Sequence, residues 1–151
     1  MAKILVSNCL IGCLCRYKGD AMLCPAVASL AGRHTLIGVC PEQMGGLPTP
    51  RDPSEIVGDR VISSSGRDVT KEYEAGAEAA LRLAKLNRVD FAILKANSPS
   101  CGCGRIYDGT FSGTKTEGDG MTVRLLKKNG FKVFTEEQED LWPLKKTNRK
   151  G

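Results

Sequence analysis

The sequence predicts an α/β fold built around a mainly parallel sheet. Short apolar runs alternate with segments of helical periodicity, which is the order expected when helices connect parallel strands. The length of 151 residues fits one domain, and the balance of 41% hydrophobic and 26% charged residues excludes general disorder. We therefore expect a single domain over residues 1–140, followed by a basic tail at 141–151.

The first half of the chain is expected to supply two buried strands, at 3–7 and 35–39. A short helix is expected between them, at 24–33. Residues 41–53 contain four prolines and two glycines, which predicts an ordered, turn-rich loop. A small edge strand is expected after this loop, at 60–62.

The second half begins with the clearest helix, at 69–88, which has an apolar side. Asp68 is expected to cap this helix together with Thr70. The remaining elements are expected in the order strand, Gly/Ser-rich segment, helix and strand, at 90–95, 97–120, 121–128 and 131–134. Joined by right-handed connections, they make a Rossmann-like three-layer sandwich, in which ligands bind beyond the carboxyl ends of the strands.

Cysteine is the unusual residue, with seven copies against a single histidine. An odd number excludes a fully paired set of internal disulfides, and a chain of this length can build a core without them. Sulfur in such a chain indicates a metal or chemistry in a reducing compartment, so we expect a cytoplasmic protein. No run of about eighteen apolar residues occurs, so no membrane partner is expected.

The apolar N-terminal run at residues 4–15 has a second interpretation. Residues 10–13 resemble a lipoprotein cleavage site. The run spans twelve residues, however, and a secretory signal needs roughly fifteen to thirty. A buried strand followed by a cysteine loop is therefore the expectation.

Three cysteines each follow the carboxyl end of an expected strand: Cys9, Cys40 and Cys101. Such ends share one rim of a parallel sheet, so thiols from distant parts of the sequence can converge there. Thiolates suit zinc or an iron–sulfur cluster, and the lack of a Cys-x-x-Cys pair disfavours a zinc ribbon or a thioredoxin-like motif. Three ligands leave a coordination position open for a substrate atom. The alternative is that these are ordinary buried cysteines.

Polar side chains suited to acid–base chemistry are expected at the same rim. Glu42 follows the second strand, Lys95 ends the third, and Ser98 and Ser100 come shortly after it. A carboxylate, an ammonium and hydroxyls beside a metal can move protons. Arg51 either contacts a substrate oxygen or phosphate or forms a structural ion pair. Lys95, Ser98 and Arg51 are the candidate substrate-binding residues.

Five strings of residues are distinctive. They are SNCLIG at 7–12 with RYKG at 16–19, CPEQMGGLPTPR at 40–51, GRDVT at 66–70, LKANSPSCG at 94–102 and IYDGTF at 106–111. With them the sequence resembles the thiouracil desulfidase family, also described as domain of unknown function 523. The resemblance extends over about residues 3–135, nearly the whole chain.

The resemblance implies a [4Fe-4S] cluster held by Cys9, Cys40 and Cys101, with one iron not ligated by protein. That iron takes the sulfur of a thiolated uracil, and the products are uracil and hydrosulfide, without net redox. Glu42 and Ser100 fall at the positions of the family's acid–base pair. This chemistry is physically reasonable, because a soft thiocarbonyl sulfur suits iron and water can then add to the ring carbon in a hydrolytic desulfuration, with Glu42 as the base.

Four cysteines exceed the three that the family uses, namely Cys13, Cys15, Cys24 and Cys103. Cys103 lies two residues after Cys101 and is an alternative third ligand. Cys101 is preferred because it lies within the SPSCG motif. The roles of the other three stay open.

Three function classes remain at this point. The first is a cluster-dependent desulfidase acting on a small thiolated base, and the second is a non-catalytic iron–sulfur or zinc-binding protein. The third is a desulfidase acting on thiolated tRNA, in which the basic tail attracts phosphate. Aromatic residues make up only 5% of the chain, and four tail residues account for most of the net charge of +5. Both observations favour a small-molecule partner over nucleic acid.

Overall fold

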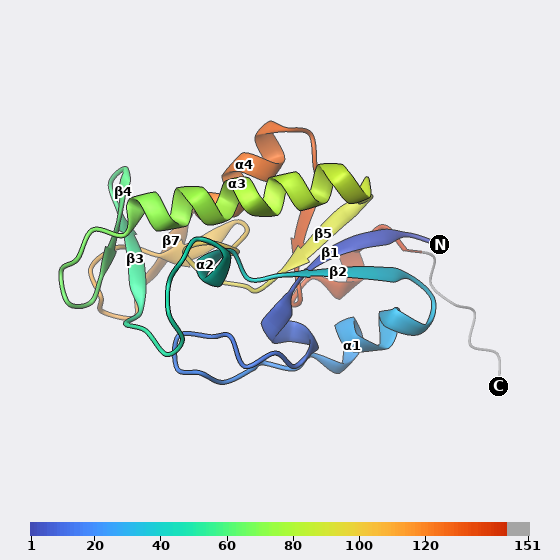
Figure 1. Cartoon of the computed structure of the whole chain (residues 1–151), viewed down its shortest axis with the longest axis horizontal. Coiled ribbons are helices and arrows are strands. Elements are labelled where there is room, and N and C mark those ends of the chain that lie inside the picture. Colours follow the sequence, from blue (N-terminus) through green and yellow to red (C-terminus); the bar gives the residue numbers. More distant parts are fainter. Residues whose placement is uncertain (145–151) are drawn as a thin grey trace.

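A four-stranded parallel sheet forms the centre of the computed structural model, which describes residues 1–144 (Figure 1). The strands, in spatial order, are β2 (Thr35–Val39), β1 (Lys3–Ser7), β5 (Phe91–Leu94) and β8 (Val133–Thr135). The chain passes from β1 to β2 and then returns to the other side of β1, so the strand succession reverses between β1 and β5. The loops that follow these two strands therefore diverge and leave a crevice at their carboxyl ends.

Each face of the sheet carries its own hydrophobic cluster, because side chains along a strand alternate between the faces. In β1, Ile4 belongs to one cluster and Leu5 to the other. The Leu5 face is covered by α3 (Thr70–Asn87) and α4 (Met121–Lys128). The Ile4 face is covered by α1 (Pro25–Ala28) and the 3-10 turn Ser29–Gly32. The predicted α/β three-layer sandwich is confirmed (Figure 1).

The long helix α3 begins one residue later than predicted, and its start differs from the expected cap. Thr70 is the first helical residue, and its hydroxyl accepts the N–H of Val61 at 2.8 Å. The Asp68 carboxylate accepts the N–H of Thr70 at 2.9 Å. Asp68 therefore satisfies a free N–H at the helix start, as predicted, whereas Thr70 ties the helix to the neighbouring strand.

Three helical segments differ from the sequence prediction. The expected helix at 24–33 is α-helical only over α1, after which the chain tightens into the 3-10 turn. The turn-rich loop expected at 41–53 begins with a single helical turn, α2 (Pro41–Met44). A 3-10 turn, Asn8–Ile11, directly follows β1. Segments of four residues are too short for a 3.6-residue period to be visible in the sequence.

Two antiparallel hairpins lie beyond the carboxyl ends of the sheet strands (Figure 1). The first pairs β3 (Ser54–Val57) with β4 (Arg60–Ser63), which contains the strand expected at 60–62. The second pairs β6 (Arg105–Tyr107) with β7 (Lys115–Glu117), inside the segment expected to be Gly/Ser-rich and irregular. Strands of three or four residues give too little alternation to be read from the sequence.

The described chain ends against the Ile4 face of the sheet. Trp142 is 7% exposed, joins the hydrophobic cluster there and donates its indole N–H to the Thr135 carbonyl at 3.1 Å. Residues 145–151 of the predicted basic tail lie outside the described residues. Among the helices of residues 1–144, none combines the length and the apolar content needed to cross a bilayer.

Candidate active site

A cavity of about 540 Å³ opens at the carboxyl ends of β1, β2 and β5. Its volume lies in the range of roughly 300–1,000 Å³ that is typical of small-molecule sites. All three predicted cysteine ligands line it, as do the five predicted polar residues Glu42, Arg51, Lys95, Ser98 and Ser100. The crevice at the strand reversal is thus the place where the predicted site residues meet.

Each of the three predicted ligand cysteines follows the carboxyl end of a different strand. Cys9 lies in the 3-10 turn after β1, Cys40 separates β2 from α2, and Cys101 follows β5. Cys9 and Cys101 are buried, Cys40 is partly buried, and all three are free of disulfides. Burial raises the pKa of Cys9 to about 11 and that of Cys101 to about 12. Thiolates in this cavity therefore need a positively charged partner.

The chemistry of the donor set suits an iron–sulfur cluster, because three free thiols from separate strand ends line one cavity. Within residues 1–144, no group of three or more His, Cys, Asp or Glu side chains is arranged to hold a single metal ion. In a [4Fe-4S] cluster each cysteine binds a different iron, so three thiols around a cavity do not have to converge on one point. Bound iron also supplies the charge that stabilises buried thiolates.

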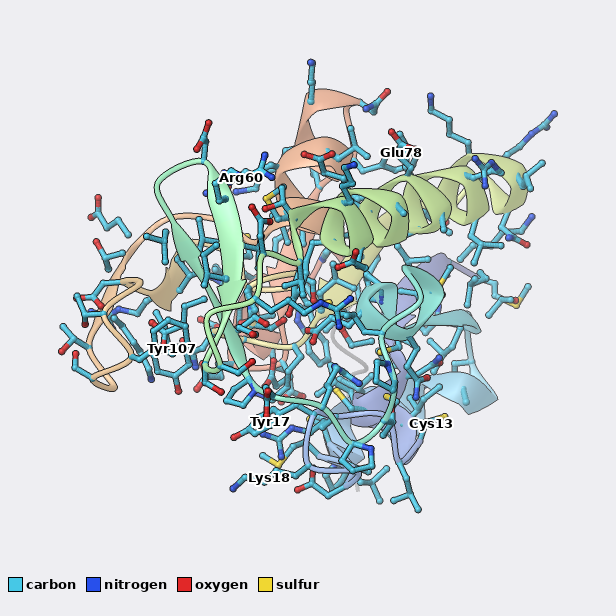
Figure 2. The ribbon with its side chains drawn as sticks, turned by 60° about the vertical axis from the view of Figure 1, so that its left-hand side comes forward. Cys13, Tyr17, Lys18, Arg60, Glu78 and Tyr107 are labelled. Carbon is cyan, nitrogen blue, oxygen red and sulfur yellow. The ribbon has the colours of Figure 1, made fainter. Side chains whose placement is uncertain are left out.

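The structure separates Cys101 from its alternative, Cys103. The Cys103 thiol donates to the Val133 carbonyl at 3.4 Å and packs against the Leu5-face cluster, away from the cavity lining. Cys24 packs against the cluster on the other face, and Cys13 is exposed on the loop after β1 (Figure 2). Of Cys13, Cys24, Cys101 and Cys103, only Cys101 lines the cavity.

A fourth thiol, Cys15, also lines the cavity. Cys15 is 4% exposed, and the Cys40 thiol donates to its backbone carbonyl at 3.8 Å. Burial, followed by the nearby Cys40 and Cys9 thiols, raises the pKa of Cys15 strongly. The strand-end argument missed it because no strand precedes Cys15. Its adjacency to the matched RYKG string was the available signal.

Glu42 and Ser100 form a hydrogen-bonded pair in the cavity. The Ser100 hydroxyl donates to Glu42 Oε2 at 3.0 Å, and the Ser98 hydroxyl lies 2.9 Å from that of Ser100. Ser98 also accepts the backbone N–H groups of Ser100 (3.1 Å) and Cys101 (3.0 Å). Ser98 therefore fixes the turn that presents both the catalytic hydroxyl candidate and the third thiol.

A further donor holds the Glu42 carboxylate, and a buried phenol is close to it. Arg51 Nε donates to Glu42 Oε1 at 3.0 Å, and Tyr73 lines the cavity near enough to Glu42 for the two groups to interact. Burial and the Glu42 charge raise the pKa of Tyr73 well above its ordinary value, so the phenol stays protonated and remains a donor. A carboxylate held from several sides keeps a fixed orientation toward the cavity.

Most N–H groups of the Arg51 guanidinium form hydrogen bonds within the protein. Besides Glu42, its guanidinium donates to the carbonyls of Cys15 (2.9 Å) and Pro48 (3.2 Å) and to the Thr49 hydroxyl (3.0 Å). Its side chain is 6% exposed. Of the two roles considered from the sequence, the geometry favours the structural ion pair, because one of five N–H groups is left for a substrate.

Lys95 is held at the cavity by Glu136, at 2.9 Å. Its own backbone N–H donates to the Ser7 hydroxyl at 2.9 Å, which links the ends of β1 and β5. The Lys95 ammonium lowers the pKa of Cys9, although burial outweighs it. Lys95 is therefore a fixed positive charge beside the thiols.

Two glycines allow α2, which carries Glu42, to lie directly on α3. A Cβ at Gly76 of α3 would overlap the Pro41 carbonyl, and one at Gly45 would overlap the Glu72 carbonyl. The backbones touch with no side chain between them. This contact fixes the position of Glu42 relative to α3, the longest helix of the domain.

Residues 4–138 match the 2-thiouracil desulfurase family. The chain belongs to this family. The match covers both the sheet and the cavity, so the resemblance seen in the sequence is confirmed.

Two similar proteins place this desulfurase family member in context. A solved structure of the [4Fe-4S]-dependent thiouracil desulfidase TudS is 46% identical, with a TM-score of 0.84, covering 91% of this chain and 93% of that one. The uncharacterized protein YbbK of Bacillus subtilis (strain 168) is 43% identical over 145 residues, covering 89% of this chain and 96% of its own length.

Aromatic residues are the second group in this family member that the sequence argument missed. Four of the chain's eight aromatic side chains line the cavity: Tyr17, Tyr73, Tyr107 and Phe111. Tyr17 comes from the loop after β1, whereas Tyr107 ends strand β6 (Figure 2). The low aromatic content disfavours a broad stacking surface, but an overall percentage does not show that half of the aromatic side chains lie at one cavity.

Proposed function

We propose that the protein is a [4Fe-4S]-dependent desulfidase that removes sulfur from a thiolated nucleobase such as thiouracil. In net terms the thiocarbonyl and one water give the carbonyl of uracil and hydrosulfide, with no electrons gained or lost. The observation that carries the proposal is one cavity that is lined by Cys9, Cys40 and Cys101 and that also holds the hydrogen-bonded pair Glu42 and Ser100.

Cys9, Cys40 and Cys101 would hold the cluster, leaving one iron without a protein ligand. When bound, the cluster supplies a soft Lewis acid for the thiocarbonyl sulfur. Lys95 adds a fixed positive charge on the same side of the cavity. Such a charge favours thiolates and developing negative charge on sulfur.

Glu42 is the proposed general base. Its carboxylate, oriented by Arg51, accepts a proton from the water that attacks the ring carbon. Ser100 donates to Glu42, and we assign its hydroxyl the transfer of a proton from that carboxylate to the departing sulfur. Its distance of 3.5 Å from Cys101 Sγ supports a position beside the proposed cluster. Ser98 keeps that hydroxyl in place.

The cavity supports a small substrate over thiolated tRNA. Its volume suits a single base. The basic residues of its lining are Arg16, Arg51 and Lys95, and each of them forms an ion pair with an acidic residue. The lining therefore offers no unpaired basic cluster for an RNA backbone. The seven free cysteines support a reducing compartment, and we propose the cytoplasm.

The test is reconstitution of the cluster under nitrogen, followed by assays of sulfide release and uracil formation from 4-thiouracil. We expect turnover by the reconstituted protein and a loss of about 10²- to 10⁴-fold in Glu42→Gln and in Ser100→Ala, as is usual for a lost acid–base group. Both variants should retain wild-type iron content. Equal turnover by metal-free protein would exclude the mechanism, and binding of the cluster without turnover would favour a non-catalytic role.

A further inference from the structure

Phe111 has an unusual position at the cavity. Its side chain lines the cavity and is 40% exposed, although it is a large apolar group. Its backbone lies in the left-handed region, with φ of 56°. That conformation is costly for a bulky residue and persists only where the surrounding structure enforces it.

A buried carboxylate enforces the conformation. Glu55, on β3, is 9% exposed, and its Oε1 accepts the backbone N–H groups of Gly109 (3.0 Å) and Phe111 (3.2 Å). Gly109 has φ of 92°, and a Cβ there would come within 2.6 Å of the Ile56 carbonyl oxygen. The loop that carries Phe111 is therefore held against β3 by two hydrogen bonds and a close backbone contact. These contacts fix the position of the phenyl ring.

The loop is also braced from within. The Asp108 carboxylate accepts the backbone N–H of Thr110 at 3.0 Å, and the Thr110 hydroxyl is bonded to the same oxygen. Asp108 in turn donates its backbone N–H to the Thr114 carbonyl at 2.9 Å. These bonds stabilise the turn that carries Phe111 without burying its ring.

We propose that Phe111 is a specificity-determining residue whose ring stacks on the pyrimidine ring of the substrate, and that Glu55 is a positioning residue that holds it there. The inference rests on the proposed function for the identity of the ring. A preorganised, solvent-facing aromatic surface is suited to a flat, polarisable ring, and thiolation makes a pyrimidine more polarisable. Because Phe111 contacts the face of the pyrimidine, the polar groups of the cavity have to bind only the atoms at its edge.

The test compares Phe111→Ala, Phe111→Tyr and Glu55→Ala, with Leu86→Ala as the control. Leu86 is 72% exposed on α3 and does not line the cavity. Two quantities are measured on reconstituted protein: the equilibrium dissociation constant of uracil, by calorimetry, and the KM and kcat for 4-thiouracil. Iron content and visible absorbance establish that each variant holds its cluster.

Stacking on an aromatic side chain contributes enough to affinity that Phe111→Ala should raise the uracil dissociation constant and the KM by about 5- to 100-fold. The kcat should change less than about twofold. Phe111→Tyr should restore most of the affinity, because it keeps the ring. Glu55→Ala should raise the KM in the same direction, and Leu86→Ala should match the wild type.

Unchanged uracil binding in Phe111→Ala would overturn the inference, as would a fall in kcat with an unchanged KM. If the wild type binds uracil but releases no sulfide from 4-thiouracil, a loss of binding in Phe111→Ala still supports the stacking role while the proposed reaction fails. If the wild type binds no pyrimidine, both fail together.

Discussion

The Ser100 hydroxyl lies 3.0 Å from Glu42 Oε2, although 58 residues separate the two in the sequence. Glu42 is placed by the contact of α2 with α3, and Ser100 by the turn that follows β5. The sheet brings these two segments together because the ends of β2 and β5 flank the end of β1. The pair is thus a product of tertiary structure and not of either local segment.

Replacing Cys101 by serine should abolish cluster retention, whereas Cys103→Ser should leave it intact. The Cys101 thiol lies in the cavity, and the Cys103 thiol faces the Val133 carbonyl. The measurements are iron per chain and visible absorbance after anaerobic reconstitution. The two variants are a matched pair, since each removes one sulfur from the same loop. Loss of the cluster in Cys103→Ser alone would show that the ligand assignment is wrong.

Arg51→Lys should lower both activity and stability. Lysine cannot reproduce four donations from a planar guanidinium, so Glu42 loses its fixed orientation and the Cys15 carbonyl loses its donor. We expect kcat to fall by about tenfold or more and the free energy of unfolding to fall by about 1–3 kcal/mol. Kinetics and urea denaturation measure the two effects. Arg60→Lys, in the half-exposed pair with Asp68, is the control and should differ little from the wild type in either assay.

Gly76→Ala should destabilise the domain and impair catalysis, because the new Cβ meets the Pro41 carbonyl and pushes α2 away from α3. Overpacking of this kind typically costs about 1–3 kcal/mol. Gly32→Ala, where no atom lies within 4 Å of the added Cβ, should be close to neutral. Thermal unfolding separates the two variants. Equal melting temperatures would mean that the backbones can move apart freely.

The contribution of Asp68 to stability should depend on pH. Hydrogen bonds from the Thr70 hydroxyl and backbone N–H, and from the Arg60 guanidinium, lower the pKa of Asp68 from 3.8 to about 2. Between these values the unfolded chain binds more protons than the folded one, so stability rises with pH there. The stabilisation is complete above about pH 4 and is lost as the pH falls toward 2.

Comparing Asp68→Asn with the wild type by urea denaturation across this range measures the effect. The variant should be less stable at neutral pH, and the difference should shrink below about pH 4. Asp59→Asn, in the exposed turn between β3 and β4, serves as the control. A stability difference that stays constant from pH 7 to pH 2 would contradict the prediction.

The sequence predicts the central sheet well because its strands are buried apolar runs, and their ends then locate Cys9, Cys40 and Cys101. It does not locate Cys15, whose place depends on Arg51, 36 residues away, donating to its carbonyl. Phe111 is hidden for a similar reason, since its position depends on Glu55 in a strand too short to be recognised. Contacts between distant loops leave no periodic signal along the chain.

The delivery of thiols from three separate strand ends has a consequence for how the protein is made. Cys101 leaves the ribosome long after Cys9 and Cys40, and its strand, β5, must first dock along the free edge of β1. A nascent chain that stops short of β5 offers two of the three sulfur donors. Under the proposed function, iron and sulfide therefore meet all three donors only once β5 has paired with β1, so assembly of the cluster follows formation of the sheet.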